Sequence, residues 1–300
     1  MTTLPRQAQT VSPHGASAAT VEAARRSPVS YDEAMDELIR TFPFPGYVKP
    51  DQARLSFRPA ADLLARHAPA GARVLDFGSG PADIDVVLSR MGYRCAACDD
   101  LRDPWHTAPG AREKILSYAA RHGVEFEVLE AGRAWPWAPE SFDAVMLHHV
   151  LEHLHESPRE LLNTLLGLVR VGGVLIVTVP NAVNLRKRLS VLRGRTNLAP
   201  YDHFYWHEGP WRGHVREFVR DDLVQLARYL GLEMLEVGSY HAMIQVVPRR
   251  MRAIWKAVTA LATGCRDSWY LAARKPAGWT ARLTLPEGDP VRERLKRIKH

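Results

Sequence analysis

The stretch R-V-L-D-F-G-S-G-P-A, residues 73–82, decides the fold of this chain of 300 residues. It begins at the end of an apolar run that is typical of a buried strand, and Gly78 and Gly80 follow where a strand would turn into a helix. Glycine is needed at such a turn because the backbone must bend tightly and approach a ligand with no Cβ in the way. The helix predicted over residues 84–90 would point its free N–H groups and the positive end of its dipole at the same pocket. The stretch therefore predicts a strand, a nucleotide-type turn and a helix.

The turn departs from the dinucleotide fingerprint G-x-G-x-x-G, because Asp83 stands at the third glycine position and Asp85 follows. Two carboxylates there would repel a pyrophosphate, so a ligand with an amine suits the turn better. The residues resemble motif I of the class I S-adenosylmethionine (SAM) methyltransferases, D/E-x-G-x-G-x-G, with Ala82 in place of the last glycine. The resemblance implies SAM as the cofactor. The motif residues that would contact it are Asp76, Phe77, Gly78, Ser79 and Gly80.

The composition limits the classes of protein to which the chain can belong. Its length allows one α/β domain of roughly 200 residues with appendages, and its apolar content of 46% is enough for a buried core. The formal net charge of +7 is gathered in patches, so charge alone does not indicate a nucleic-acid partner. The chain lacks both an apolar leader and an apolar run of the roughly 18 residues that a membrane span needs. We therefore expect a cytoplasmic protein.

Three cysteines, Cys95, Cys98 and Cys265, make neither a disulfide framework nor a four-ligand zinc site. Cys95 and Cys98 fall on one predicted strand, where residues three positions apart point to opposite faces of the sheet. We therefore expect reduced cysteines in a core strand rather than a redox pair.

The chain divides into four predicted parts. Residues 1–30 are rich in Ser, Thr, Ala, Pro and Gln without a periodic apolar face, and predict a disordered tail. Residues 31–70 predict a helical cap of two helices, which the resemblance implies should cover the cofactor pocket. Residues 71–276 are the predicted methyltransferase domain. Residues 277–300 are a basic tail, either a solvated end or a peripheral contact for an anionic membrane surface.

A second strand is predicted over residues 93–100, and it ends in two acids. Asp99 lies 19 residues after Gly80, and an acid about 20 residues beyond the turn is placed to accept hydrogen bonds from both ribose hydroxyls of a bound nucleoside. Asp100 is the second candidate for this contact. The alternative is that these acids are solvated loop residues. We favour Asp99 because it lies nearer the end of the strand.

The stretch E-A-G-R-A-W-P-W-A-P-E-S-F-D, residues 130–143, follows a third predicted strand over 124–129. It resembles the methyltransferase stretch G-D-A-x-x-L-P-F-x-x-x-S-F-D, in which the first Asp binds the adenine amine. Aligned without gaps, that Asp falls on Ala131. Glu130, one residue earlier, is the alternative, so two candidates remain for the adenine contact.

The run H-H-V-L-E-H-L-H, residues 148–155, stands at the carboxyl end of a fourth predicted strand over 142–147. In an open α/β sheet, ligands bind outside the carboxyl ends of the strands, near the point where the strand order reverses. The first and fourth strands flank that crevice in the resembled fold. We therefore expect His148 and His149 to face cofactor and substrate.

The motifs S-F-D, H-V-L-E-H and V-P-N occur in this order over residues 141–181. As a set they resemble the large family of bacterial small-molecule and glycan-pathway methyltransferases. The resemblance implies an α/β fold of the Rossmann-like type, with a doubly wound, mostly parallel seven-stranded sheet and a lid after the fifth strand. The further predicted elements are helices over 112–122 and 157–169, a strand after R-V-G-G (170–173), a helix capped by Asp221, a strand over 232–237, a helix over 243–263 broken at Pro248, and a last strand over 268–274.

The lid, residues 181–215, leaves the regular alternation of strands and helices. Its first half sets leucines at helical spacing among Arg and Lys residues, and its second half gathers aromatic and histidine side chains. Such side chains suit a sugar, an aromatic or a phosphorylated substrate. The alternative is that the aromatics only pack the lid onto the sheet. The candidate substrate-binding residues are Tyr201, His203, Tyr205, Trp206, His207, Trp211 and Arg212.

Methyl transfer from SAM is an in-line displacement, so the protein must align the acceptor, exclude water and, for a hydroxyl acceptor, remove a proton. Histidine is the natural base near neutral pH. His149 and His153 are the first candidate bases, with His214 behind them. The sequence therefore predicts a SAM-dependent methyltransferase that acts on a small-molecule or glycan-type acceptor, by O-methylation.

Two rival functions stay open, and the first is an RNA 2′-O-methyltransferase with a metal site. Small-RNA 2′-O-methyltransferases and related ubiquinone-pathway enzymes have a magnesium site of the pattern E-x-x-E-H plus a downstream His. This chain resembles that pattern at His149, Glu152, His153 and the later His214. Here His149 replaces the first glutamate, which weakens a site for a hard cation, although zinc or iron would accept the imidazoles. Because of this lost carboxylate we expect no metal. We also expect no nucleic-acid partner, because no RNA-binding module or aromatic stacking platform is found in the sequence. The other rival is a non-catalytic SAM-binding protein.

Overall fold

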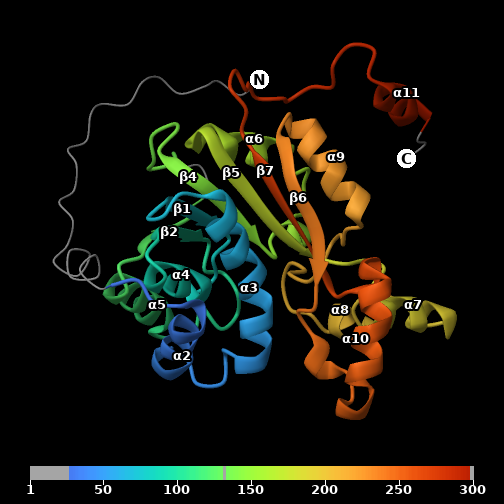
Figure 1. Cartoon of the computed structure of the whole chain (residues 1–300), viewed down its shortest axis with the longest axis horizontal. Coiled ribbons are helices and arrows are strands. Elements are labelled where there is room, and N and C mark those ends of the chain that lie inside the picture. Colours follow the sequence, from blue (N-terminus) through green and yellow to red (C-terminus); the bar gives the residue numbers. More distant parts are fainter. Residues whose placement is uncertain (1–26, 131–132, 298–300) are drawn as a thin grey trace.

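The computed structural model describes residues 27–130 and 133–297, and its centre is a seven-stranded sheet between two layers of helices (Figure 1). The strand order is β3-β2-β1-β4-β5-β7-β6. β7 pairs antiparallel with β5 and β6, and the other neighbours pair in parallel. The strands are β1 (Arg73–Phe77), β2 (Arg94–Asp99), β3 (Glu125–Val128), β4 (Phe142–His148), β5 (Val169–Pro180), β6 (Glu233–Tyr240) and β7 (Ser268–Arg274). The predicted fold class is confirmed; the disorder expected of residues 1–30 falls almost wholly outside the described residues.

Helices cover both faces of the sheet because each strand turns alternate side chains into two separate cores. In β2, Cys95 belongs to one core and Cys98 to the other, as predicted, and both are free thiols. Four helices pack into the core that holds Cys95: α2 (Tyr31–Thr41), α3 (Pro50–His67), α4 (Asp83–Arg90) and α5 (Ala111–Arg121). Two helices pack into the other core: α6 (Arg159–Leu168) and α9 (Arg220–Leu230).

Side-chain caps set where two of these helices begin. At α2, the amide of Ser30 donates to Glu33 Oε2 at 2.9 Å and the amide of Glu33 donates to Ser30 Oγ at 3.3 Å, a reciprocal capping box. At α9, the expectation that Asp221 caps the helix is wrong. The amide of Val219 donates to Asp222 Oδ2 at 3.0 Å instead, and the Asp221 side chain points to solvent.

β5 is longer than predicted. α6 ends at Leu168 and β5 begins at once, so residues 170–173, R-V-G-G, continue the strand rather than forming a turn before it. A Cβ at Gly173 would lie 2.7 Å from the backbone oxygen of Asp143 in β4. Glycine therefore allows the two backbones to pass closely enough for the strand to start early.

The second half of the chain places three helices beyond the carboxyl ends of β5 and β6 (Figure 1). α7 (Leu185–Leu192) and α8 (Tyr201–Tyr205) lie in the lid, and α10 (Arg252–Leu261) follows Pro248, which interrupts the predicted helix as expected. α11 (Pro290–Arg297) lies in the basic tail. Among the described residues, no helix combines the length and the apolar composition needed to cross a lipid bilayer.

Candidate active site

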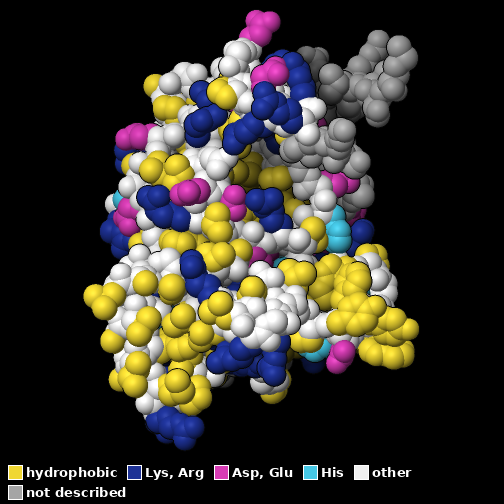
Figure 2. All heavy atoms as spheres, turned by 90° about the vertical axis from the view of Figure 1, so that its right-hand side faces the viewer, with side chains coloured by type: hydrophobic (Ala, Val, Ile, Leu, Met, Phe, Trp, Pro, Cys, Tyr) yellow, Lys and Arg dark blue, Asp and Glu magenta, His cyan; other side chains and the backbone are white. Residues whose placement is uncertain are grey.

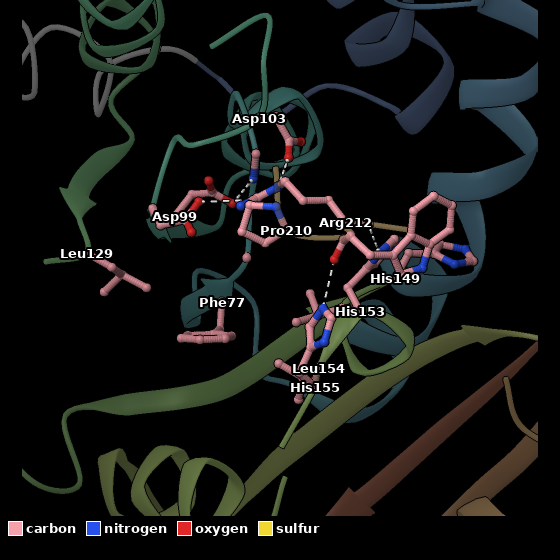
Figure 3. Close-up of a pocket in the computed structure, with 15 residues that line it drawn as sticks. Phe77, Asp99, Asp103, Leu129, His149, His153, Leu154, His155, Pro210 and Arg212 are labelled. Carbon is pink, nitrogen blue, oxygen red and sulfur yellow. Dashed lines mark hydrogen bonds and ion pairs between the residues drawn. The ribbon is translucent and has the colours of Figure 1, made fainter. Parts of the chain in front are cut away.

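A cavity of about 510 Å³ opens at the carboxyl ends of β1, β2 and β4 (Figure 3). This is the edge of the sheet where the strand order reverses, since β1 lies between β2 and β4. The lining residues are Phe77, Gly78, Gly80, Asp99, Asp100, Asp103, Leu129, His149, Val150, His153, Leu154, His155, Pro210, Trp211 and Arg212. The cavity thus joins the glycine turn, the acids after β2, the histidines after β4 and the end of the lid.

The glycine turn and the acid at the end of β2 form one wall of this cavity. The amide of Gly80 donates to Asp99 Oδ2 at 2.9 Å, and the amide of Leu101 donates to Asp99 Oδ1 at 2.7 Å. Gly80 has a φ of +54° and Gly78 a φ of +74°, and a Cβ on Gly78 would lie 2.7 Å from Val150. The turn therefore requires glycine for its backbone conformation and, at Gly78, for its packing.

The structure separates the predicted cofactor residues into three groups. Phe77, Gly78, Gly80, Asp99 and Asp100 line the cavity. Asp76 and Ser79 are buried next to it without lining it. Glu130 is exposed and does not line the cavity, Ala131 lies outside the described residues, and Leu129 lines the cavity beside them.

A cluster of carboxyl groups lies behind the turn. Asp76 is 1% exposed and Asp85 is fully buried, and burial, followed by repulsion between the two, raises the pKa of Asp76 well above its usual value. Burial likewise raises the pKa of Asp85, and it raises the pKa of Asp83 to about 6. Burial of this kind favours the neutral form of a carboxyl group, and none of the three residues lines the cavity.

His148 and His149 differ in their surroundings. His148 is held by Thr178 Oγ1 at 2.8 Å and Ser56 Oγ at 3.3 Å, and burial, with a smaller effect of His149, keeps its pKa well below the usual value. It stays neutral and does not line the cavity. His149 does line the cavity, in a left-handed conformation with φ of +57°. Its Nδ1 lies 3.0 Å from Glu152 Oε1 and its Nε2 lies 3.1 Å from the Tyr240 hydroxyl.

The charges on these partners define the proton positions on His149. Burial alone would raise the pKa of Glu152, but the hydrogen bond and the charge of His149 outweigh it and hold the pKa below the usual value. Glu152 is therefore an anion and accepts a hydrogen bond from His149 Nδ1–H. When the ring of His149 is neutral, this leaves its Nε2 as an acceptor for the O–H of Tyr240, whose pKa is raised by burial. The three side chains form a chain from Tyr240 through His149 to Glu152.

The other two candidate bases, His153 and His214, lie close to the same glutamate. One ligand atom each of Glu152, His153 and His214 lies within 4.8 Å of the others. His153 Nδ1 bonds to the backbone oxygen of Arg212 and His214 Nδ1 to Glu217 Oε1, both at 2.8 Å, which leaves the two Nε2 atoms available. Glu152 Oε2 is buried and has no hydrogen-bond partner among the described residues. Two imidazoles and a carboxylate in this arrangement fit a transition-metal cation such as Zn²⁺.

Only the end of the lid reaches the cavity. Trp211 and Arg212 line it, and Arg212 pairs across the opening with Asp103 at 2.5 Å and with Asp100 at 3.3 Å (Figure 3). His155 also contacts the end of the lid, because its Nε2 donates a hydrogen bond to the backbone oxygen of Trp211 at 2.8 Å. The remaining predicted substrate-binding residues, Tyr201, His203, Tyr205, Trp206 and His207, do not line the cavity.

Sequence reasoning missed two features of the site. Tyr240 is the last residue of β6, but the predicted strand ends at residue 237. The sequence therefore did not predict that the Tyr240 hydroxyl lies next to His149. The helical cap was expected to cover the cofactor pocket, yet no residue of α2 or α3 lines the cavity. α3 packs on the sheet instead, because its buried face of Phe57, Ala60, Ala61 and Leu64 is apolar.

Comparison with known proteins places the chain in a family. Residues 52–237, more than half of the chain, match the family model described as a methyltransferase domain. A trans-aconitate 2-methyltransferase of Mycobacterium sp. strain KMS is 31% identical over 160 residues, which are 51% of this chain and 58% of that protein. A ubiquinone biosynthesis O-methyltransferase of Xanthomonas axonopodis pv. citri strain 306 is 26% identical over 180 residues, which are 59% of this chain and 69% of that protein. The chain thus spans little more than half the length of the first relative.

A solved structure shows the same fold. It holds the Trm112 methyltransferase activator of Haloferax volcanii in complex with a methyltransferase, and the likeness has a TM-score of 0.51 at 14% identity, over 84% of this chain and 100% of that chain. The family model also spans the glycine turn, the acid at the end of β2, the histidine run and the whole lid. The chain therefore belongs to the methyltransferase domain family, as its resemblance to the class I SAM methyltransferases predicts.

Proposed function

We propose that this chain transfers the methyl group of SAM to an oxygen of a small-molecule or glycan-type acceptor. The observation that supports this most is that the glycine turn and Asp99 are hydrogen-bonded to each other and face one cavity. The two relatives are named for methyl transfer to trans-aconitate and for O-methylation in ubiquinone biosynthesis. Both names agree with a small acceptor.

SAM supplies a methyl group that is already activated on a sulfonium. The chain therefore has to bind SAM and the acceptor, orient them toward each other and exclude water. In this proposal, Asp99 accepts hydrogen bonds from the ribose hydroxyls, with Asp100 next to it. The backbone of Gly78 and Gly80 lies against the nucleoside, because no Cβ keeps it away.

His149 is the proposed base. Glu152 orients its ring and stabilises the imidazolium that forms when a proton arrives at Nε2. The Tyr240 hydroxyl lies 3.1 Å from that nitrogen. As the acceptor oxygen bonds to the methyl carbon and the methyl–sulfur bond breaks, the proton of the acceptor passes to His149 Nε2, the ring nitrogen of a residue that lines the cavity.

The test is methyl transfer itself. The protein is incubated with methyl-labelled SAM and a small-molecule extract of cells, and label is followed into low-mass products. We expect transfer that disappears with His149→Ala, with SAM affinity measured in parallel by calorimetry. SAM binding without any transfer would support the rival of a non-catalytic SAM-binding protein. No SAM binding at all would overturn the proposal.

A second candidate function is metal-assisted methyl transfer. The cluster of Glu152, His153 and His214 supports it, although the sequence alone led us to expect no metal. A divalent cation held by these three side chains would attract acceptor oxygens and make an acceptor hydroxyl more acidic. Calorimetric titration with Zn²⁺ and Mn²⁺ after dialysis against EDTA tests the site. We expect binding that His214→Ala weakens and that His207→Ala, a histidine of the lid outside the cluster, leaves unchanged. Equal binding by both variants would exclude this site.

A further inference from the structure

α10 presents its apolar side chains to water. Among its ten residues only Thr259 is buried, while Ile254 is 65% exposed and Leu261 is 93% exposed. A surface helix of a globular protein normally turns its apolar side chains toward the core and its polar ones outward. α10 reverses this order, which is typical of a helix that lies against a partner or a membrane.

The lid helices show the same reversal. Neither α7 nor α8 has a buried residue. Leu192 at the end of α7 is 81% exposed, and Trp206 just after α8 is 77% exposed. Tyr201 and Tyr205 are also exposed, although the sequence predicts that they bind substrate. These aromatics contact neither the cavity nor the sheet core, so neither interpretation of the lid from sequence accounts for them.

The three helices lie at one end of the molecule (Figure 1), and we call their exposed sides together the basic apolar face. Two contacts join the segment that leads into α7 to the segment that follows α10. The side-chain Nδ2 of Asn181 donates to the backbone oxygen of Gly264 at 2.8 Å, and Arg186 pairs with Asp267 at 2.9 Å. Figure 2 shows groups of apolar side chains at the lower left and at the right of the molecule, with Lys and Arg side chains between and below them. The exposed apolar residues of this face are Val191, Leu192, Leu198, Tyr201, Phe204, Tyr205, Trp206, Met251, Ile254, Val258 and Leu261.

The charge of this face is predominantly positive. Residues 185–206 contain five Lys or Arg against one Asp, and residues 244–262 contain four Lys or Arg and no acid. Five of these basic residues are exposed and form no ion pair with any described residue: Arg193, Arg195, Arg249, Arg250 and Lys256. Unpaired positive charge among exposed apolar side chains is the pattern that binds an anionic lipid surface.

We propose that the basic apolar face docks this protein on an anionic lipid bilayer. The apolar side chains of α7, α8 and α10 enter the interface between headgroups and acyl chains, and the unpaired Arg and Lys side chains bind the lipid phosphates. A second copy of the chain fits less well, because a symmetric contact would bring like charges together. A nucleic acid would not account for exposed Leu192, Ile254 and Leu261.

Docking would place the cavity beside the bilayer. Trp206 is followed after three residues by Pro210, Trp211 and Arg212, which line the cavity. An acceptor carried in the membrane would therefore reach the site without crossing bulk water. The docking proposal itself does not depend on methyl transfer, and either can fail without the other.

Cosedimentation with vesicles tests the proposal on the full chain. The vesicles are phosphatidylcholine alone, and phosphatidylcholine mixed with phosphatidylglycerol. We expect binding only to the mixed vesicles. The apolar pair Ile254→Ser and Leu261→Ser should weaken it by about tenfold or more, and the charge pair Arg249→Glu and Arg250→Glu by a similar factor.

Matched controls change residues of the same type elsewhere on the surface. Met234→Ser replaces an exposed apolar residue at the far end of β6, and Arg112→Glu reverses an exposed charge on α5. Both should bind mixed vesicles like the unchanged chain, and all variants should keep their circular dichroism spectrum and their SAM affinity. Absence of binding to mixed vesicles would overturn the proposal. So would a charge effect without an apolar effect, or apolar variants that dissociate a dimer in sedimentation velocity.

Discussion

Gly80 and Asp99 lie 19 residues apart in the chain and are joined by a hydrogen bond of 2.9 Å from the amide of Gly80 to Asp99 Oδ2. Because both residues also line the same cavity, the turn after β1 and the end of β2 form one binding wall rather than two separate features. The carboxylate has both oxygens engaged by backbone amides, so its position is determined before any ligand arrives.

Replacing Asp99 should therefore weaken SAM binding without unfolding the protein. Asp99→Ala removes the acceptor of both ribose hydroxyls, and each hydrogen bond to a charged group is worth about 1.5–3 kcal/mol. We therefore expect a loss of about a hundredfold or more in affinity. Calorimetry with SAM measures it. Asp221→Ala, which removes a solvent-exposed carboxylate on α9, is the control. Unchanged affinity of Asp99→Ala would show that the ribose contact is misassigned.

The hydrogen bonds that join Tyr240, His149 and Glu152 predict that substitutions there lower turnover much more than they lower SAM affinity. Loss of a general base typically costs a factor of about 10² to 10⁴ in rate, so His149→Ala should lower kcat by that order while SAM affinity stays the same. Tyr240→Phe should lower kcat as well, because the hydroxyl that faces His149 Nε2 is removed. Steady-state kinetics with the identified acceptor measures both. A loss confined to SAM affinity would argue that His149 is not the base.

Arg212 should hold the end of the lid over the cavity. Its ion pairs with Asp103 and Asp100 are partly exposed, so their loss should change the free energy of unfolding by only about 0–1 kcal/mol. The dissociation rate of SAM should nevertheless rise several-fold in Arg212→Ala, because the opening is no longer bridged. Stopped-flow displacement measures this rate. Arg228→Ala, which removes an exposed ion pair of α9, is the comparison, and an equal rise in both variants would contradict the interpretation.

The buried carboxyl pair predicts a pH dependence of stability. The pKa of Asp76 and of Asp85 is raised in the folded state, so the folded protein binds protons that the unfolded chain releases above a pKa of 3.8. Their contribution is therefore most favourable below that value and is lost as the pH rises through the folded-state pKa. Asp85→Asn keeps the side-chain size and removes one ionisable group.

We expect Asp85→Asn to raise the melting temperature more at pH 8 than at pH 5, relative to the unchanged chain. Thermal denaturation followed by circular dichroism at the two pH values measures the difference. Asp221→Asn, on the exposed turn of α9, should shift the melting temperature by the same small amount at both. If the shift in melting temperature caused by Asp85→Asn did not depend on pH, folding would not change the pKa values of Asp76 and Asp85.

Local patterns were enough for most of the framework. The strand, glycine turn and helix over residues 73–90, the opposed directions of Cys95 and Cys98, and the last strand over 268–274 all follow from periodicities of a few residues. The prediction was less accurate where one residue decides a boundary. Gly173 allows β5 to start early, and Asp222 rather than Asp221 caps α9, because both depend on which neighbouring backbone atom lies within reach.

The site shows the same division. Spacing alone placed Gly80 and Asp99 together, since the carboxyl ends of neighbouring parallel strands meet at one edge. Tyr240, in contrast, meets His149 from 91 residues away, and the aromatics of α8 face outward although their composition suits a substrate pocket. Periodicity and turn chemistry act over a few neighbouring residues, so the sequence by itself determines them. Which side chains from distant segments hydrogen-bond to each other, and which stay exposed, depends on tertiary packing, which is determined by the free energy of the whole fold.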